Sequence, residues 1–538
     1  MDTQSPSHVG IPSPSHDSHS IILTESQLSG LAVPKSSNDA STNRHLRVFM
    51  PADGPNINLC KTVMSSVALG YPLPTLLNWD GDFNRPEWHF GGSHIAKLES
   101  LLAVIEELLD NSQDAHEDDL ALMVDAYDIW FQLPPSVLIQ RYHQLNREAD
   151  ERNQRLWEDA MRRHADQEES ESLKDRPVFP IPPPRQSIVV TAAKDCHPDS
   201  NSGSNPHYEL WPPSPMPTDL YGDTTDVPTP SLFDTSRTHS RIRPRCLNSG
   251  LIIGTMGSLR DALRRAEEKI QVAARAGRQL WSDQALLAEV IGDQHAWRLW
   301  AQGLAATWNG TASVSRVSTL HEHVRMVGAA AVEEGTRFEF GIGVDYNFTM
   351  IPPTCSSEED GYFAQINNKV DLMLQSEKAG VSGEVRVKDI PPELENAEDV
   401  KGGPWDEIHW GYEDLYSDFF FGVTPVGIHH NAYRNGLKAW RLKHWWPRMW
   451  FYSRLRDLVT YSLRLRNKWE RVLVSLPQGD GEAIVYKAPK EESTTIFNPR
   501  REGSPAGFEE LGWDAVCQKG STPWYDELFG DNEGPLEV

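Results

Sequence analysis

Two aspartates stand directly after an apolar run that has the length of a strand. The motif Asp125-Ala126-Tyr127-Asp128 follows residues 120–124, which are Leu, Ala, Leu, Met and Val. Carboxylates are preferred ligands of hard divalent cations, and ligands often bind at strand ends along the edge of an open α/β sheet. In a continuing strand, residues three apart point to opposite faces, so both carboxylates could reach one ion only if the chain turns directly after Asp125. The alternative is that both aspartates cap a turn or the next helix.

Three further short motifs contain residues that could bind or catalyse. Residues 248–250 (Asn-Ser-Gly) could let the backbone approach a ligand closely, or could form an ordinary turn into a strand. Residues 282–284 (Ser-Asp-Gln) stand at a predicted helix start, where an N-cap followed by an acidic first turn is the simpler interpretation. In residues 429–431 (His-His-Asn), an imidazole could complete a metal site begun by two aspartates, and Lys438 could hold a phosphate.

The elements that must position these motifs alternate between strand and helix. Apolar runs predict strands at 47–51, 74–79, 120–124, 188–192, 247–254 and 341–347. Helical spacing of apolar residues predicts helices at 56–70, 94–110, 257–277 and 282–291, and a heavily charged helical pattern covers 134–175. Because the strands are continuously apolar, they are expected to be buried on both faces, which predicts an α/β fold.

Composition divides the chain into regions of different character. The first 44 residues are rich in Ser, Pro and His and contain no Phe, Trp or Tyr, so they are predicted to be disordered. The regions that follow are a main domain over 45–440 with irregular insertions at about 150–185 and 197–243, a basic Trp-rich helical segment over 441–475, and an acidic, loosely ordered tail over 476–538.

Charge and cysteine content exclude several classes of function. The chain of 538 residues carries 51 Lys and Arg against 77 Asp and Glu, a formal net charge of −26, so general binding to nucleic acid is not expected. The five cysteines form no Cys-x-x-Cys pair, which argues against zinc-ribbon and thioredoxin-type sites. The sequence contains no run of about 18 apolar residues, so no membrane span is predicted. The first residues do not have the pattern of a signal peptide.

Taken in order, the motifs resemble the glycosyltransferase domain of lysyl hydroxylases. The matching segments lie between about 45 and 440 and are 88–94 (WHFGGSH), 124–128 (VDAYD), 188–198 (IVVTAAKDCHP), 247–254 (LNSGLIIG), 283–284 (DQ) and 426–431 (VGIHHN). That family has a GT-A fold, a Rossmann-like α/β/α sandwich with a mixed central sheet. It uses a UDP-sugar as donor and a divalent metal, Mn²⁺ or Mg²⁺.

The resemblance implies roles for particular residues. Asp125, Asp128 and His429 would be metal ligands, and Asn248 and Asp283 would face the sugar and the acceptor. Either Trp79 or Trp88 would stack on uracil, and the sequence does not distinguish between the two. The remaining residues implied at the donor site are Gly92, Tyr127, Gly250 and Lys438, the last beside the diphosphate. This sequence departs from the family where His430 and Ala432 replace glycines and where His197 replaces a tryptophan.

The function expected from this resemblance is transfer of a hexose from a UDP-sugar to a hydroxyl group of a protein or glycan. The alternatives are a catalytically degenerate binding or scaffold protein, and a metal-dependent hydrolase of nucleotide sugars. The family implies the lumen of the Golgi or endoplasmic reticulum, which the sequons at Asn309 and Asn347 would suit. The missing signal peptide or anchor conflicts with that expectation. The oligomeric state stays open.

A basic segment stands out against the acidic chain. Residues 434–471 contain eleven Lys and Arg, two acidic residues and five tryptophans. The first interpretation is a helix packed on the catalytic domain with a solvated basic face. The second is peripheral membrane contact through 441–471, since Trp with Lys and Arg on an amphipathic helix suits a membrane interface. The third is a platform on which tryptophans stack against an acceptor sugar.

Overall fold

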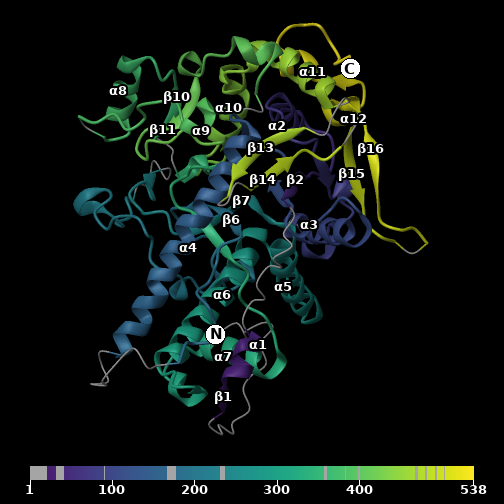
Figure 1. Cartoon of the computed structure of the whole chain (residues 1–538). Helices are drawn as coiled ribbons and strands as arrows, with labels where there is room; N and C mark the ends of the chain where they lie inside the picture. The colour runs from purple at the N-terminus through teal and green to yellow at the C-terminus, as the bar shows by residue number, and fades with distance from the viewer. Residues whose placement is uncertain are drawn as a thin grey trace.

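A large mixed β-sheet runs through the centre of the molecule and helices cover both of its faces (Figure 1). This computed structural model describes residues 21–537 apart from 32–41, 90, 166–176, 231–236, 357–359, 382, 398–399, 467–470, 479–481, 491–492 and 502. The chain is therefore a mixed α/β protein, as its strand and helix pattern predicts.

The main sheet has ten strands, and eight of them follow the order β16-β15-β3-β2-β4-β7-β6-β9. Its strands are β2 (Asn43–Pro51), β3 (Thr75–Leu77), β4 (Leu120–Val124), β6 (Ile188–Ala193), β7 (Cys246–Thr255), β9 (Ile342–Asp345), β13 (Val472–Pro477), β14 (Ala483–Lys487), β15 (Thr494–Asn498) and β16 (Gly507–Leu511). Strand β2 pairs in parallel with β3, β4 and β14, whereas β7 runs antiparallel to both β4 and β6. The carboxyl ends of β2, β3, β4 and β6 therefore meet at one edge, together with the first half of β7.

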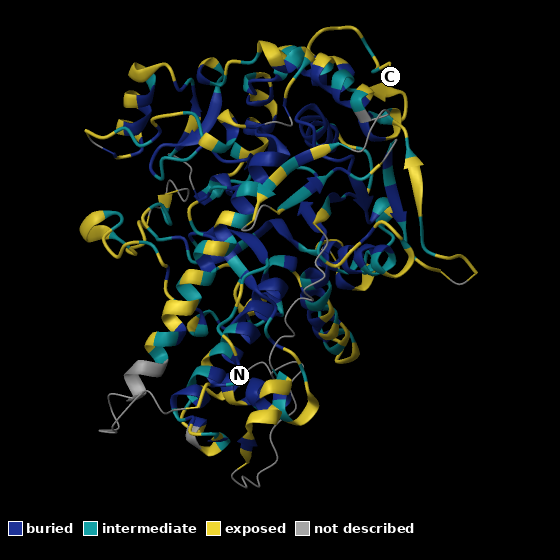
Figure 2. Cartoon of the chain, viewed as in Figure 1, coloured by how far each residue is buried: buried dark blue, intermediate teal, exposed yellow. Residues whose placement is uncertain are grey.

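Alternating side chains of the central strands fill a separate hydrophobic core on each face. In β4, Leu120, Leu122 and Val124 enter one core, and Ala121 and Met123 enter the other. The first core is covered by α2 (Ile57–Ala68) and α4 (Pro135–Ala165), the second by α3 (Gly91–Asn111), α5 (Met256–Arg275) and α6 (Asp283–Ala306). Figure 2 shows the resulting band of buried residues through the middle of the molecule.

The predicted strands and helices are confirmed, with bounds that move by a few residues and with α6 continuing to Ala306. Helix α4 confirms the helical pattern predicted over 134–175 as far as Ala165, so the first part of the insertion at about 150–185 is helical rather than irregular, and 166–176 lie outside the described residues. The insertion at 197–243 is irregular as expected, with 3-10 turns at Ser200–Ser202, Tyr208–Leu210 and Gly222–Thr224. A disulfide between Cys196 and Cys246 closes its base.

The N-terminal region is more ordered than its composition predicts. Residues 21–31 contain β1 (Ile22–Thr24) and α1 (Glu25–Leu31), and β1 pairs with β8 (Thr311–Ser313). Leu23 and Leu28 are fully buried in a third core shared with α6 and α7 (Glu322–Glu334). The prediction of disorder is therefore wrong for these residues, while 1–20 and 32–41 lie outside the described part of the chain.

The acidic C-terminal region is part of the fold rather than a loose tail. Strand β14 adds to the start of β2, and β15 adds to β3 as a parallel neighbour. Helix α12 (Trp513–Cys517) is tied to α2 by a disulfide between Cys60 and Cys517, which are 457 positions apart. Helix α13 (Tyr525–Phe529) places buried side chains in the first core. The prediction of loose order over 476–538 is wrong for the described residues.

The basic Trp-rich segment also packs into the first core. It forms α10 (Leu437–His444) and α11 (Leu455–Arg466), joined by two 3-10 turns. Trp445, Trp446 and Trp450 are buried, as the packing in the first interpretation predicts, although they lie between the two helices rather than on one. Trp440 is half exposed, and Trp469 lies outside the described residues.

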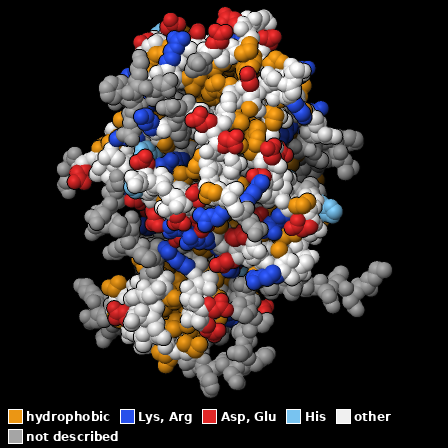
Figure 3. Space-filling view, turned by 90° about the vertical axis from the view of Figure 1, so that its right-hand side faces the viewer, with side chains coloured by type: hydrophobic (Ala, Val, Ile, Leu, Met, Phe, Trp, Pro, Cys, Tyr) orange, Lys and Arg blue, Asp and Glu red, His pale blue; other side chains and the backbone are white. Residues whose placement is uncertain are grey.

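Smaller elements complete the outer part of the molecule. They are β10 (Gly361–Ala364), β11 (Leu415–Asp418), α8 (Lys369–Lys378) and α9 (Pro392–Glu395), with a short β17 (Gln518–Lys519) and β18 (Thr522–Pro523) hairpin. Over the face in Figure 3, acidic and basic side chains are interspersed with apolar ones. Among the described residues, no helix has the length and apolar character needed to cross a bilayer.

Candidate metal centre

The chain turns directly after β4, as a shared metal site requires. The amide of Asp125 still donates to the carbonyl of Gly250 in β7, at 2.9 Å, and residues 126–128 form a turn. The chain then enters β5 (Ile129–Phe131), which pairs antiparallel with β12 (Gly427–His429) and places Ile129 opposite His429. This small ladder brings a histidine 300 positions further along the chain to the two aspartates.

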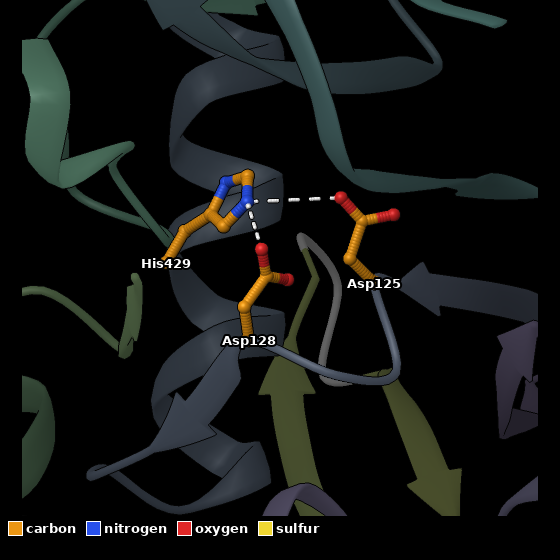
Figure 4. A group of neighbouring side chains, drawn as sticks. All are labelled: Asp125, Asp128 and His429. Carbon is orange, nitrogen blue, oxygen red and sulfur yellow. Dashed lines mark ion pairs between the residues drawn. The ribbon is translucent and has the colours of Figure 1, made fainter. Parts of the chain in front are cut away.

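Asp125, Asp128 and His429 converge on one point (Figure 4). One ligand atom from each residue lies within 4.8 Å of the other two. The His429 Nε2 atom is 3.7 Å from Asp125 Oδ2 and 3.4 Å from Asp128 Oδ2. Ligand atoms around one small divalent cation lie about 3–4 Å apart, so the spacing fits such an ion. Among the described residues, no other three His, Cys, Asp or Glu side chains converge in this way.

The imidazole of His429 is oriented by a neighbour on β7. Asn248 Oδ1 accepts a hydrogen bond from His429 Nδ1 at 3.1 Å and another from the amide of Gly250 at 3.0 Å. Because Nδ1 donates, the unprotonated atom of a neutral ring is Nε2, which faces the two carboxylates. A side chain at Gly250 would overlap the His429 ring. The donor set therefore fits a divalent cation, and the glycine expected to admit a ligand instead admits the imidazole.

Lys97 lies between the metal cluster and Asp283. Its ammonium group is 2.6 Å from Asp125 Oδ1, 2.9 Å from Asp283 Oδ2 and 2.7 Å from the carbonyl oxygen of Ser249. Burial alone would lower the pKa of Lys97, but the two carboxylates outweigh it and raise that pKa. Lys97 was not among the residues predicted for the site. Its position in the sequence could have pointed to it, because Lys97 lies four residues before Leu101 and so on the predicted apolar face of α3.

Asp283 combines the capping position predicted for it with a place in the site. The Ser282 hydroxyl accepts from the amide of Ala285 and caps α6, as the simpler interpretation predicts. The Asp283 carboxylate is buried, and its Oδ2 accepts from the Ser249 hydroxyl at 2.8 Å. Burial raises the pKa of Asp283, but Lys97 above all overcomes that effect and keeps the pKa below its usual value. The group is therefore a charged carboxylate at neutral pH.

Lys438 lies on the other side of the cluster. Its ammonium group is 2.5 Å from Asp128 Oδ2, although it comes from α10, far along the chain. Burial opposes ionisation of Asp128, yet His429 and Lys438 hold the pKa of Asp128 well below its usual value. The structure thus brings Lys438 to the cluster, as the resemblance implies.

The two tryptophans proposed to stack on uracil differ in accessibility. Trp88 is only 4% exposed, and the guanidinium of Arg85 covers its ring at 5.0 Å, so it offers no free face. Trp79 follows β3 and is partly exposed. Trp79 is therefore the more accessible of the two.

Tyr127 and Gly92 occupy different surroundings. The Tyr127 hydroxyl donates to Asp53 Oδ1 at 2.5 Å, which turns the ring toward the end of β2. Gly92 is the second residue of α3, where a side chain would collide with the carbonyl of Arg85. Close packing therefore explains the glycine at position 92, and no contact joins this residue to the three residues of the candidate metal centre among those described.

His430 points away from the cluster. Its side chain is fully buried against Trp130, with ring centroids 3.9 Å apart. Neither ring nitrogen has a hydrogen-bond partner in the described part of the chain. Burial and Arg441 hold the pKa of His430 well below its usual value, so the ring is neutral. His430 therefore acts as a packing residue, and of the two histidines it is His429 that faces the aspartates.

Comparison with models of known protein families finds no match, and a search of curated proteins finds none either.

Proposed function

We propose that this chain is a divalent-metal-dependent glycosyltransferase of GT-A type, which transfers a hexose from a UDP-sugar to a hydroxyl group of a glycan or protein. The observation that carries the proposal is the convergence of Asp125, Asp128 and His429 at the carboxyl edge of the sheet. Lys97 and Asp283 extend this cluster in one direction and Lys438 in another. Such a set of charges suits a diphosphate leaving group beside a sugar.

Each residue has a chemical task under this proposal. A divalent ion held by the triad would supply positive charge for the departing diphosphate. Lys438 is exposed enough to exchange Asp128 for a diphosphate oxygen. Because Lys97 keeps Asp283 charged, we assign to Asp283 the stabilisation of positive charge at the anomeric carbon. Asn248 holds the ring of His429, so it acts as a positioning residue.

The nucleoside has a separate place in the same proposal. The strand order β3-β2-β4-β7 puts Trp79 and Asp53, with its partner Tyr127, on one side of Asp125. Asn248 and Asp283 lie on the other side, with β7. We therefore place uracil near Trp79 and Tyr127 and the hexose near Asp283.

Features outside the site support the compartment that the resemblance implies. Two disulfides join Cys60 to Cys517 and Cys196 to Cys246, and protein disulfides persist mainly in oxidising compartments. The sequon asparagines Asn309 and Asn347 are both exposed. These features favour an enzyme of the secretory pathway.

A thermal-shift titration tests the donor site. UDP, UDP-glucose, UDP-galactose, GDP-mannose and ADP are each added with and without Mn²⁺, because a ligand that binds only the folded state raises the melting temperature. We expect a Mn²⁺-dependent shift with uridine nucleotides that Asp125→Ala removes and that Asp219→Ala, at an exposed position in the insertion, keeps. The absence of any nucleotide shift would contradict the donor-site assignment and favour a scaffold protein.

Product analysis separates transfer from hydrolysis. With a UDP-sugar and a panel of acceptors, a transferase leaves the sugar on an acceptor, and a nucleotide-sugar hydrolase yields only free sugar and UDP. The second outcome would replace the proposed reaction while leaving the metal site in place.

A further inference from the structure

The side chain of Gln284 joins the start of α6 to β7 and to the base of the insertion at 197–243. Its Nε2 group donates to the carbonyl oxygen of His197 at 2.5 Å. Its Oε1 atom accepts from the backbone amide of Ser249 at 3.3 Å and from Asn248 Nδ2 at 3.2 Å. Each end of the Gln284 side chain therefore meets a backbone atom, an acceptor at one end and a donor at the other.

These backbone atoms decide which way the two side-chain amides point. An amide group can be turned over so that its oxygen and nitrogen exchange places, and only its partners distinguish the two orientations. The His197 carbonyl can only accept, so it requires the nitrogen of Gln284. The Ser249 amide can only donate, so it requires the oxygen of Gln284. The Gly250 amide likewise requires the oxygen of Asn248, which leaves the nitrogen of Asn248 facing the oxygen of Gln284.

This series of hydrogen bonds ends at the imidazole of His429. Asn248 Oδ1 accepts from His429 Nδ1 at 3.1 Å, so Nδ1 carries a proton. The lone pair of a neutral ring then lies on Nε2, which faces Asp125 and Asp128 (Figure 4). If Asn248 were turned over, its nitrogen would face Nδ1, and the ring proton would occupy Nε2 in place of a metal ion. The orientation of two amides thus decides whether His429 can be a ligand.

We propose that Gln284 is a positioning residue of the metal centre, because it holds the Asn248 amide in the orientation that leaves Nε2 of His429 free to bind a divalent cation. The Gly250 amide is one fixed partner of Asn248, and Gln284 is the second. Without Gln284, a single backbone hydrogen bond would set the orientation. This inference rests on the metal binding that is part of the proposed function.

Mn²⁺ affinity, measured by isothermal titration without nucleotide, tests this role independently of catalysis. Gln284→Met keeps the length of the side chain but removes its hydrogen bonds, so we expect it to weaken Mn²⁺ binding about ten-fold or more. Gln279→Met is the matched control, since it removes a side-chain hydrogen bond to the carbonyl of Glu87 and should leave the affinity unchanged. Thermal melting checks that each variant is folded.

A second substitution separates orientation from packing. In Asn248→Asp, both outer atoms of the side chain are oxygens, so Nδ1 of His429 meets an acceptor whichever way the group is turned. Gln284→Met should therefore cost less than about two-fold in Mn²⁺ affinity in the Asn248→Asp background, whereas a loss through packing would be the same in both backgrounds. Comparison within each background cancels the effect of the charge that the new carboxylate adds.

Two results would overturn the inference alone: unchanged Mn²⁺ affinity in Gln284→Met, or an equal loss with and without Asn248→Asp. Wild-type protein that binds no Mn²⁺ would defeat the metal centre, and with it both the inference and the proposed function. Mn²⁺ binding that depends on Gln284 but is accompanied by no thermal shift with UDP would support the inference and contradict the proposed function alone.

Discussion

Lys97 and Lys438 each contact a carboxylate of the candidate metal centre, but their surroundings differ. The side chain of Lys97 is 7% exposed, lies on the long helix α3 and contacts both Asp125 and Asp283. The side chain of Lys438 is 48% exposed, lies on the short helix α10 and contacts Asp128. One lysine is therefore enclosed by the fold, and the other is open to solvent.

This difference separates charge that supports the fold from charge that is available to a ligand. A buried ion pair is costly to break because the remaining partner stays buried without compensation. An exposed ion pair contributes little to stability, since water competes for both groups. In the proposed function, Lys438 leaves Asp128 for the diphosphate while the fold stays intact, and Lys97 keeps its two carboxylates throughout.

Lys97→Met should have the largest effect. It leaves two carboxylates without their cation, so we expect the free energy of unfolding to fall by about 3–5 kcal/mol and glycosyl transfer to be lost. Urea unfolding measures the first quantity and an acceptor assay the second. The double variant Lys97→Met/Asp283→Asn is the control, because removing both partners should recover part of the lost stability. A single variant as stable as the wild type would show that Lys97 is not a structural charge.

Lys438→Met should have a smaller effect of a different kind. We expect stability to change by less than about 1 kcal/mol, because the ion pair is half exposed. Affinity for UDP should fall about ten-fold and become less sensitive to salt, which isothermal titration at two ionic strengths measures. Lys443→Met removes an exposed lysine from the same helix and is the matched control. Equal effects of both variants on UDP affinity would place Lys438 outside the diphosphate site.

Local pattern was enough to predict six strands of the main sheet and the acidic motif that follows one of them. Continuous apolar runs such as β4 are long enough to be recognised alone, and the motif at Asp125 follows one of them directly. The position of His429 came from the resemblance, because the β5–β12 pairing that delivers it joins segments 300 positions apart. No local spacing could have predicted that contact.

The elements and residues that were not predicted depend on contacts between distant parts of the chain. The acidic tail looks weakly apolar, but β14 and β15 gain stability from pairing with β2 and β3, and Cys517 from its disulfide with Cys60. Lys97 was missed because a lysine within an apolar helix face is normally placed at the solvent edge. Its burial makes sense only when Asp283, nearly two hundred positions later, is brought to it.

The acid dependence of stability gives the finest test of the contrast between the two lysines. In the wild type, Lys97 holds the pKa of Asp283 below its usual value despite burial, so this carboxylate contributes stability at neutral pH that is lost only as the pH falls below about 4. In Lys97→Met, only His94 and the Ser249 hydroxyl still oppose burial at Asp283, so we expect the sign to reverse and the folded state to bind the proton more tightly than the unfolded state. The destabilisation by Lys97→Met should therefore shrink by up to about 1 kcal/mol per unit as the pH falls from 7 to 5.

Lys438→Met should show no such recovery, since His429 still faces Asp128 in that variant. Urea unfolding of both variants at pH 7.5, 6.5 and 5.5 in metal-free buffer makes the comparison. His94 also faces Asp283, at 3.9 Å, so His94→Gln in the Lys97→Met background separates the imidazole's contribution from that of the carboxyl group. A penalty for Lys97→Met that stays constant or grows with falling pH would mean that Asp283 finds another cation when Lys97 is absent. The two lysines would then differ in exposure alone, and Lys97 would not be needed to keep Asp283 charged.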